Sequence, residues 1–82
     1  MGNQYMLLSE HKGILNNSNL RAEVLRKIGD ECKEHVPSGT FGIKMYIDDM
    51  LLGIEWYEGK SESWADDAAE NYVLGVKKYE RN

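Results

Sequence analysis

Cysteine and proline each occur once in this sequence of 82 residues, and it has no long apolar run. A lone cysteine cannot form a disulfide within the chain, which favours a reducing, cytoplasmic location over a secreted scaffold. No stretch approaches the roughly 18 to 20 apolar residues that span a membrane, and the first residues lack the basic and then apolar layout of a signal peptide. We therefore expect a cytoplasmic protein that does not enter membranes.

Basic residues are also few, with 10 Lys and Arg against 14 Asp and Glu and a formal net charge of −4. This balance argues against direct binding of nucleic acid, which usually requires a basic face. The acids are concentrated in residues 48–82, which carry nine acids and four bases, whereas residues 1–47 carry five acids and six bases. A chain of this length forms a single small domain, which we expect to span residues 1–82.

Apolar spacing predicts two amphipathic helices. The first, over about residues 19–34, is indicated by apolar residues that recur every three to four positions. The second, over about residues 63–79, is rich in alanine, is capped by Ser61 or Ser63, and has acids near its start. The apolar positions of the first helix are Leu20, Val24, Leu25, Ile28, Cys32 and Val36.

Strict alternation predicts a β-hairpin over residues 41–57, with a turn at Asp48-Asp49. Its core-facing residues are expected to be Phe41, Ile43, Met45 and Ile47 in the first strand, and Leu52, Ile54 and Trp56 in the second. Tyr46 and Tyr57 then point away from the core, with Glu55 between them on the surface.

Residues 1–17 fit an edge strand, a docking arm or a disordered tail, with a turn at His11-Lys12-Gly13. The predicted fold class is α+β: a small antiparallel sheet, made of the hairpin and this N-terminal strand, packed against the two helices.

Residues that could carry chemistry form no complete site. Cys32 and His35 are spaced as half of a zinc site, but a structural zinc site needs four ligands. The sequence has no nucleophile elbow and no phosphate-binding glycine loop. Asp48-Asp49 fits a turn, and Asp66-Asp67 fits the first part of a helix, where carboxylates oppose the positive end of the dipole. We expect no enzymatic activity, no metal and no cofactor.

From Phe41 onward the chain resembles the C-terminal half of a double-stranded-RNA-binding domain. The shared layout is strand, hairpin, strand and an alanine-rich helix, and the corresponding helix start is the stretch from Gly59 to Ala69. The family's phosphate-binding lysines fall here on Glu62, Ser63 and Asp66, where carboxylates would repel RNA. The resemblance therefore implies the architecture of this half and transfers no functional residue.

An acidic, aromatic surface without catalytic residues predicts a non-enzymatic protein-binding module that regulates or inhibits a larger protein, as in bacterial or phage accessory proteins. A basic nucleic-acid-handling enzyme would fit as partner, because the acids could stand in for phosphates. Two alternatives remain open: a small homodimeric structural protein paired through Tyr46, Trp56 and Tyr57, and a divergent double-stranded-RNA-binding-like domain that has lost its basic face. The predicted protein-binding residues are Tyr46, Asp48, Asp49, Glu55, Tyr57, Glu62, Asp66, Asp67 and Glu70.

Overall fold

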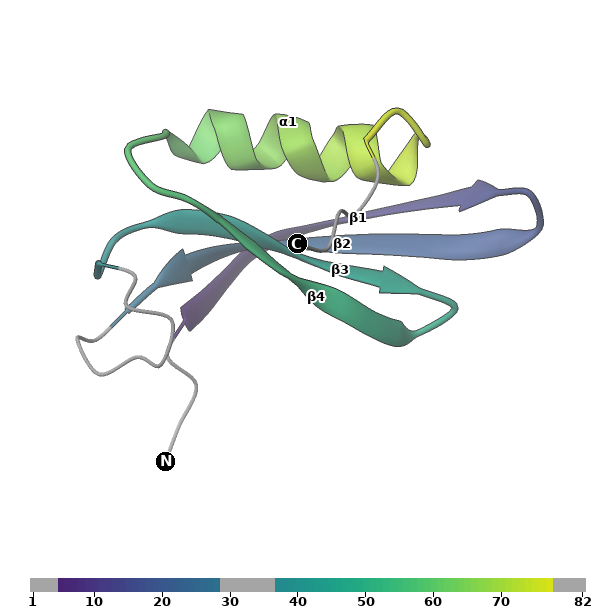
Figure 1. The fold of residues 1–82 in the computed structure, drawn as a ribbon, viewed down its shortest axis with the longest axis horizontal. Coiled ribbons are helices and arrows are strands. Elements are labelled where there is room, and N and C mark those ends of the chain that lie inside the picture. Colours follow the sequence, from purple (N-terminus) through teal and green to yellow (C-terminus); the bar gives the residue numbers. More distant parts are fainter. Residues whose placement is uncertain (1–4, 29–36, 78–82) are drawn as a thin grey trace.

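Two β-hairpins join into one antiparallel sheet, and a single described helix covers one of its faces, which makes the protein α+β. The computed structural model describes residues 5–28 and 37–77. The elements are β1 (Tyr5–Leu15), β2 (Ser18–Lys27), β3 (Phe41–Ile47), β4 (Met50–Tyr57) and α1 (Glu62–Val73). The strands lie side by side in chain order, so β1 and β4 are the two edges of the sheet. Figure 1 shows the strong twist of the sheet and α1 lying across it.

The predicted helix over residues 19–34 is wrong, because its described part belongs to β2. Leu20, Ala22 and Val24 alternate along this strand toward α1 and are buried. The spacing of Leu20, Val24 and Leu25 fits a helical period, whereas in the strand Leu25 is buried on the face opposite Leu20 and Val24. Pairing with β1 and β3 on both sides stabilises the strand. Residues 29–34 of the predicted helix, with Cys32, lie outside the described residues, as does His35.

The N-terminal segment forms an edge strand. β1 runs through the turn predicted at residues 11–13, which is wrong, and the chain reverses instead at Asn16 and Asn17. Both asparagines have positive φ, at 52° and 66°. Two left-handed residues match the twist of a tight hairpin, and asparagine tolerates that conformation better than most residues.

The hairpin over residues 41–57 is confirmed, but the second strand presents the opposite face from the one predicted. Met45 pairs with Gly53 and Tyr46 pairs with Leu51, so Leu52 is an extra residue in β4. This bulge moves every later residue of β4 to the other face. As a result, Glu55 and Tyr57 lie on the side of α1, whereas Ile54 and Trp56 share the opposite face of the sheet with Lys44 and Gly42.

Helix α1 is shorter than predicted. Ser61 caps its first turn by accepting a hydrogen bond from the backbone N–H of Trp64 at 3.3 Å. The chain leaves the helix after Val73 and turns at Gly75, which has a φ of 84°. The described structure ends before residues 78 and 79 of the predicted helix. No described helix is long and apolar enough to cross a membrane.

The core lies between α1 and the helix-facing side of β2 and β3. The buried alanines Ala65 and Ala69 bring α1 close to the sheet. Gly13 of β1 also allows a close approach, because a Cβ at residue 13 would lie 2.4 Å from the carbonyl oxygen of Val73. α1 makes its main contacts with β1, β2 and β3, and Tyr57 of β4 packs at the margin of this core. The buried residues of this core are Leu20, Ala22, Val24, Ile43, Met45, Ala65, Ala69, Tyr72 and Val73.

Candidate binding groove

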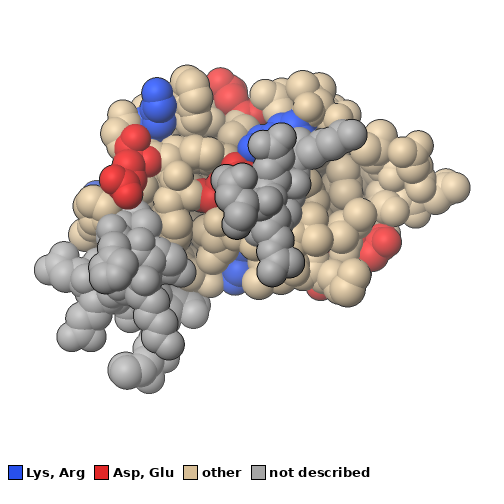
Figure 2. All heavy atoms as spheres, in the orientation of Figure 1, with Lys and Arg blue, Asp and Glu red and all other residues tan. Residues whose placement is uncertain are grey.

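The nine predicted binding residues do not form one surface. Tyr46 lies on the sheet face opposite α1, and Asp48 and Asp49 form the β3–β4 turn. Glu55 and Tyr57 lie on the helix-facing side of β4. The remaining four residues belong to α1, and they are Glu62, Asp66, Asp67 and Glu70. On the face drawn in Figure 2, the visible acidic and basic side chains lie apart from one another among uncharged residues.

Several of these carboxylates hold the fold together. Asp48 Oδ1 accepts a hydrogen bond from the backbone N–H of Asn19 at 2.9 Å, which joins the ends of the two hairpins. Asp66 Oδ1 lies 2.8 Å from His11 Nε2 and accepts a longer hydrogen bond from Ser9 Oγ at 3.4 Å. These contacts attach α1 to β1, so Asp66 is oriented toward the sheet.

Tyr46 belongs to a network on the sheet face opposite α1. The guanidinium of Arg21 lies 3.8 Å from the centre of the Tyr46 ring, and the Tyr46 hydroxyl donates to Glu23 at 3.3 Å. Arg21 also pairs with Glu23 at 2.7 Å and with Glu10 at 3.3 Å. This network pairs one guanidinium with two carboxylates and links β1, β2 and β3 in the middle of the sheet.

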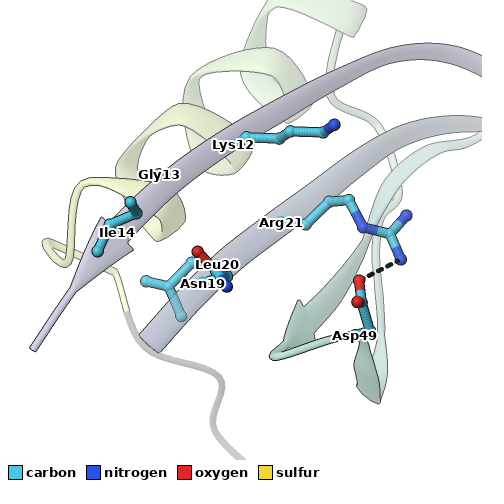
Figure 3. A pocket seen from close by; sticks show the side chains of 7 residues that line it. All are labelled: Lys12, Gly13, Ile14, Asn19, Leu20, Arg21 and Asp49. Carbon is cyan, nitrogen blue, oxygen red and sulfur yellow. Dashed lines mark ion pairs between the residues drawn. The ribbon is translucent and has the colours of Figure 1, made fainter. Parts of the chain in front are cut away.

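A hollow of about 500 Å³ lies beside this network, where β1 and β2 approach the β3–β4 turn. Figure 3 shows Arg21 reaching from β2 toward Asp49, with 3.8 Å between their charged atoms. Since Arg21 is already paired with two glutamates, the hollow offers a ligand no uncompensated positive charge.

The predicted residues Tyr57 and Asp67 meet in a second hollow, a groove of about 460 Å³ between α1 and the end of β4. Trp64, Asp67, Ala68 and Asn71 recur every three to four residues, so they form one stripe of α1 that faces the groove. We call this the α1–β4 groove, and its lining residues are Tyr57, Trp64, Asp67, Ala68, Asn71 and Lys77.

One wall of the α1–β4 groove is a connected set of polar side chains. Lys77 Nζ pairs with Glu55 Oε1 at 2.7 Å, and the Tyr57 hydroxyl donates to the same oxygen at 2.8 Å. Burial, together with the hydrogen bond and negative charge of Glu55, raises the pKa of Tyr57 well above its usual value. These three groups are therefore fixed in place and satisfy one another.

The opposite wall attracts cations. The ammonium group of Lys60 lies 4.4 Å from the centre of the Trp64 ring, a cation–π contact. Trp64 itself is half exposed, at 51%. Asp67 is exposed and has no ion-pair partner within residues 5–28 and 37–77. An aromatic face and a carboxylate without an ion pair thus lie one helical turn apart beside the groove.

Sequence reasoning missed an exposed apolar group at the start of β4. Met50, Leu51 and Leu52 are 64%, 53% and 37% exposed. The run of three apolar residues directly after the Asp48-Asp49 turn was the available signal, because alternation alone buries at most two of them. Ile14 and Leu15, at the end of β1, are exposed at the same end of the sheet.

No metal-binding group of three or more His, Cys, Asp or Glu side chains occurs in the described part of the chain. Comparison with protein-family models, curated proteins and solved structures finds no match for this chain.

Proposed function

We propose that this protein is a non-enzymatic binding module that holds a basic segment of a protein partner in the α1–β4 groove and so regulates or inhibits that partner. The observation that carries the proposal is the position of Lys60 over Trp64, next to the carboxylate of Asp67, which has no ion pair within residues 5–28 and 37–77. The chain's own lysine shows how an ammonium group fits this surface. A Lys or Arg from a partner can occupy the adjacent groove and pair with Asp67.

The charge around the groove supports a basic partner. The segment from Glu55 to Lys77 carries six acids and two bases, a net charge of −4, which equals that of the whole chain. The two bases, Lys60 and Lys77, are already engaged with Trp64 and Glu55. A field of this sign speeds the encounter with a basic surface and repels phosphates.

Binding fits the groove better than catalysis does. A general acid or base works best with a pKa near the operating pH, whereas the pKa of Tyr57 is raised away from neutrality. Glu55 and Lys77, the other charged groups of that wall, pair with each other. The groove therefore offers a concave surface, the Trp64 ring and the Asp67 carboxylate for binding, rather than a group suited to proton transfer.

The test uses the tagged full chain in a lysate of the source organism or its host, with and without nuclease. The captured protein is identified, purified and titrated against the chain by calorimetry at two salt concentrations. We expect capture to resist nuclease and affinity to fall as salt rises, because exposed charges across an interface are screened.

Asp67→Lys and Glu70→Lys form a matched pair for this titration, since both reverse one exposed charge on α1 but only Asp67 lines the groove. We expect Asp67→Lys to weaken binding by about tenfold or more and Glu70→Lys to weaken it much less. Equal losses would point to a diffuse acidic surface instead of the groove. Capture that disappears with nuclease would favour the double-stranded-RNA-binding-like alternative.

A further inference from the structure

β4 is an edge strand that the rest of the described structure leaves open. Within residues 5–28 and 37–77, β4 pairs only with β3, so alternate backbone N–H and C=O groups along its outer side face away from the sheet. The main contacts of α1 are with β1, β2 and β3 rather than with β4. An open edge of this kind is a template for another strand.

The two edges of the sheet differ in their protection. Each edge strand contains one bulge, between Leu7 and Ser9 in β1 and at Leu52 in β4, so the bulges do not distinguish the two edges. The charges do: β1 carries Glu10, His11 and Lys12 along its length, and charges on an edge strand discourage the addition of a further strand. β4 has Glu55 as its one charged residue, and that carboxylate is directed to Lys77 and the Tyr57 hydroxyl. β4 is therefore the receptive edge.

We propose that the partner binds as an additional strand along β4, with apolar residues beside Met50, Leu51 and Leu52 and a Lys or Arg in the α1–β4 groove. This inference rests on the proposed function and adds the conformation and composition of the bound segment. At about 3.3 Å per residue, the eight residues of β4 accommodate an extended segment of similar length. Main-chain hydrogen bonds would supply affinity. Specificity would come from the apolar residues at the start of β4 and from the α1–β4 groove at its end.

A second copy of this chain fits the edge less well than a basic partner. Pairing two β4 strands would bring two copies of the segment 55–77 together, each with a net charge of −4. Like charges placed opposite each other in an interface oppose association, whereas a basic segment is attracted. The charge thus selects a basic, extended peptide segment as occupant.

The test uses three synthetic peptides of about eight residues that alternate valine and lysine. One is unmodified, one is N-methylated at every valine and one at every lysine. All three carry the same side chains and charge. Along a strand, the backbone groups of alternate residues point to opposite sides, so only one of the two methylated series blocks hydrogen bonds to β4. We measure affinity by nuclear magnetic resonance titration of the ¹⁵N-labelled full chain, following the Trp64 indole and the β4 amides.

Strand addition predicts that the unmodified peptide and one methylated peptide bind alike, while the other binds about tenfold more weakly or worse. Equal binding of all three peptides would overturn strand addition and leave intact the proposed function, in which the α1–β4 groove binds a basic side chain. A control peptide alternates valine and glutamate. If neither the three lysine peptides nor this control shifts the Trp64 signal, the result would contradict both strand addition and the proposed function.

Two further measurements separate the remaining outcomes. Asp67→Lys should reduce binding of the lysine peptide and Glu70→Lys should leave it largely unchanged, which locates the lysine side chains in the groove. Light scattering of the chain alone at neutral pH should report a monomer. A dimer that Leu51→Lys dissociates would show that a second copy occupies β4 and would overturn the proposal.

Discussion

At the scale of single residues, similar side chains have different roles according to what they face. Asp66 and Asp67 are neighbours in sequence and looked equivalent as the acidic start of a helix. The turn of α1 directs Asp66 toward His11 and Ser9 of β1, and leaves Asp67 exposed at the α1–β4 groove. Charge reversal at Asp66 would therefore disturb the attachment of the helix, whereas reversal at Asp67 tests binding.

Tyr57 and Tyr72 make the stability of the fold depend on alkaline pH. Burial, followed by the hydrogen bond and charge of Glu55, raises the pKa of Tyr57 above 10.0, and burial raises the pKa of Tyr72. A raised pKa means that folding favours the protonated phenol. The stabilisation is fully present below the unfolded value of about 10 and is lost as the pH rises through the higher folded pKa.

We therefore expect the free energy of unfolding to fall above about pH 10, and to fall less steeply in Tyr57→Phe. Urea denaturation across the alkaline range measures this slope. Tyr5→Phe is the control, because Tyr5 donates no hydrogen bond to a carboxylate within the described residues and lies on the sheet face opposite α1. An unchanged slope in Tyr57→Phe would contradict the assignment of the titrating group.

At the scale of elements, local patterns predicted some pieces and misassigned others for identifiable reasons. The hairpin over residues 41–57 and the helix that starts near Ser61 follow from alternation, turn residues and capping, all of which are local. β2 was misassigned because Leu20, Val24 and Leu25 have helical spacing, and because the pairing with two neighbouring strands that stabilises β2 is not a local signal. The bulge at Leu52 has no signature in alternation, and it reversed the faces of Glu55, Trp56 and Tyr57.

The contact between β1 and α1 at Gly13 predicts a sharp sensitivity to substitution. In Gly13→Ala the new Cβ would lie 2.4 Å from the Val73 carbonyl oxygen, so the helix or the strand must move. We expect a loss of about 1 to 3 kcal/mol, the range for overpacking a tight contact. Ile14→Ala is the matched control in the same strand, because Ile14 is 73% exposed and should change stability little. Chemical denaturation of both variants measures the difference, and equal losses would show that Gly13 is not a close-packing position.

At the scale of the whole molecule, the candidate site depends on how the layers overlap. The sequence predicted the acids of α1 and the aromatic residues of the hairpin, and Tyr57, Asp67 and Glu55 do meet around one groove. The groove itself could not be predicted, because it exists only where α1 crosses β1 to β3 and leaves β4 uncovered. The same arrangement explains why Met50 and Leu51 are candidate contact residues, since they are exposed and belong to the edge strand β4.

Net charge keeps this open edge from pairing with itself. The chain carries a formal charge of −4 at pH 7 and has a pI near 5.1, so repulsion between copies disappears close to pH 5. Main-chain pairing and the apolar residues at the start of β4 then act without opposition. We expect light scattering to show monomers at pH 7 and growing association as the pH approaches 5.

Two variants locate the surface responsible for this association. Leu51→Lys places a charge on the β4 edge and should suppress it, because a lysine on an edge strand discourages pairing. Leu74→Lys adds the same charge at a residue that is comparably exposed, at 62% against 53%, but lies beyond the C-terminal end of α1. If both variants suppress association equally, net charge alone explains it. If Leu51→Lys acts and Leu74→Lys does not, the β4 edge is the contact surface, and at neutral pH it remains open to a basic partner.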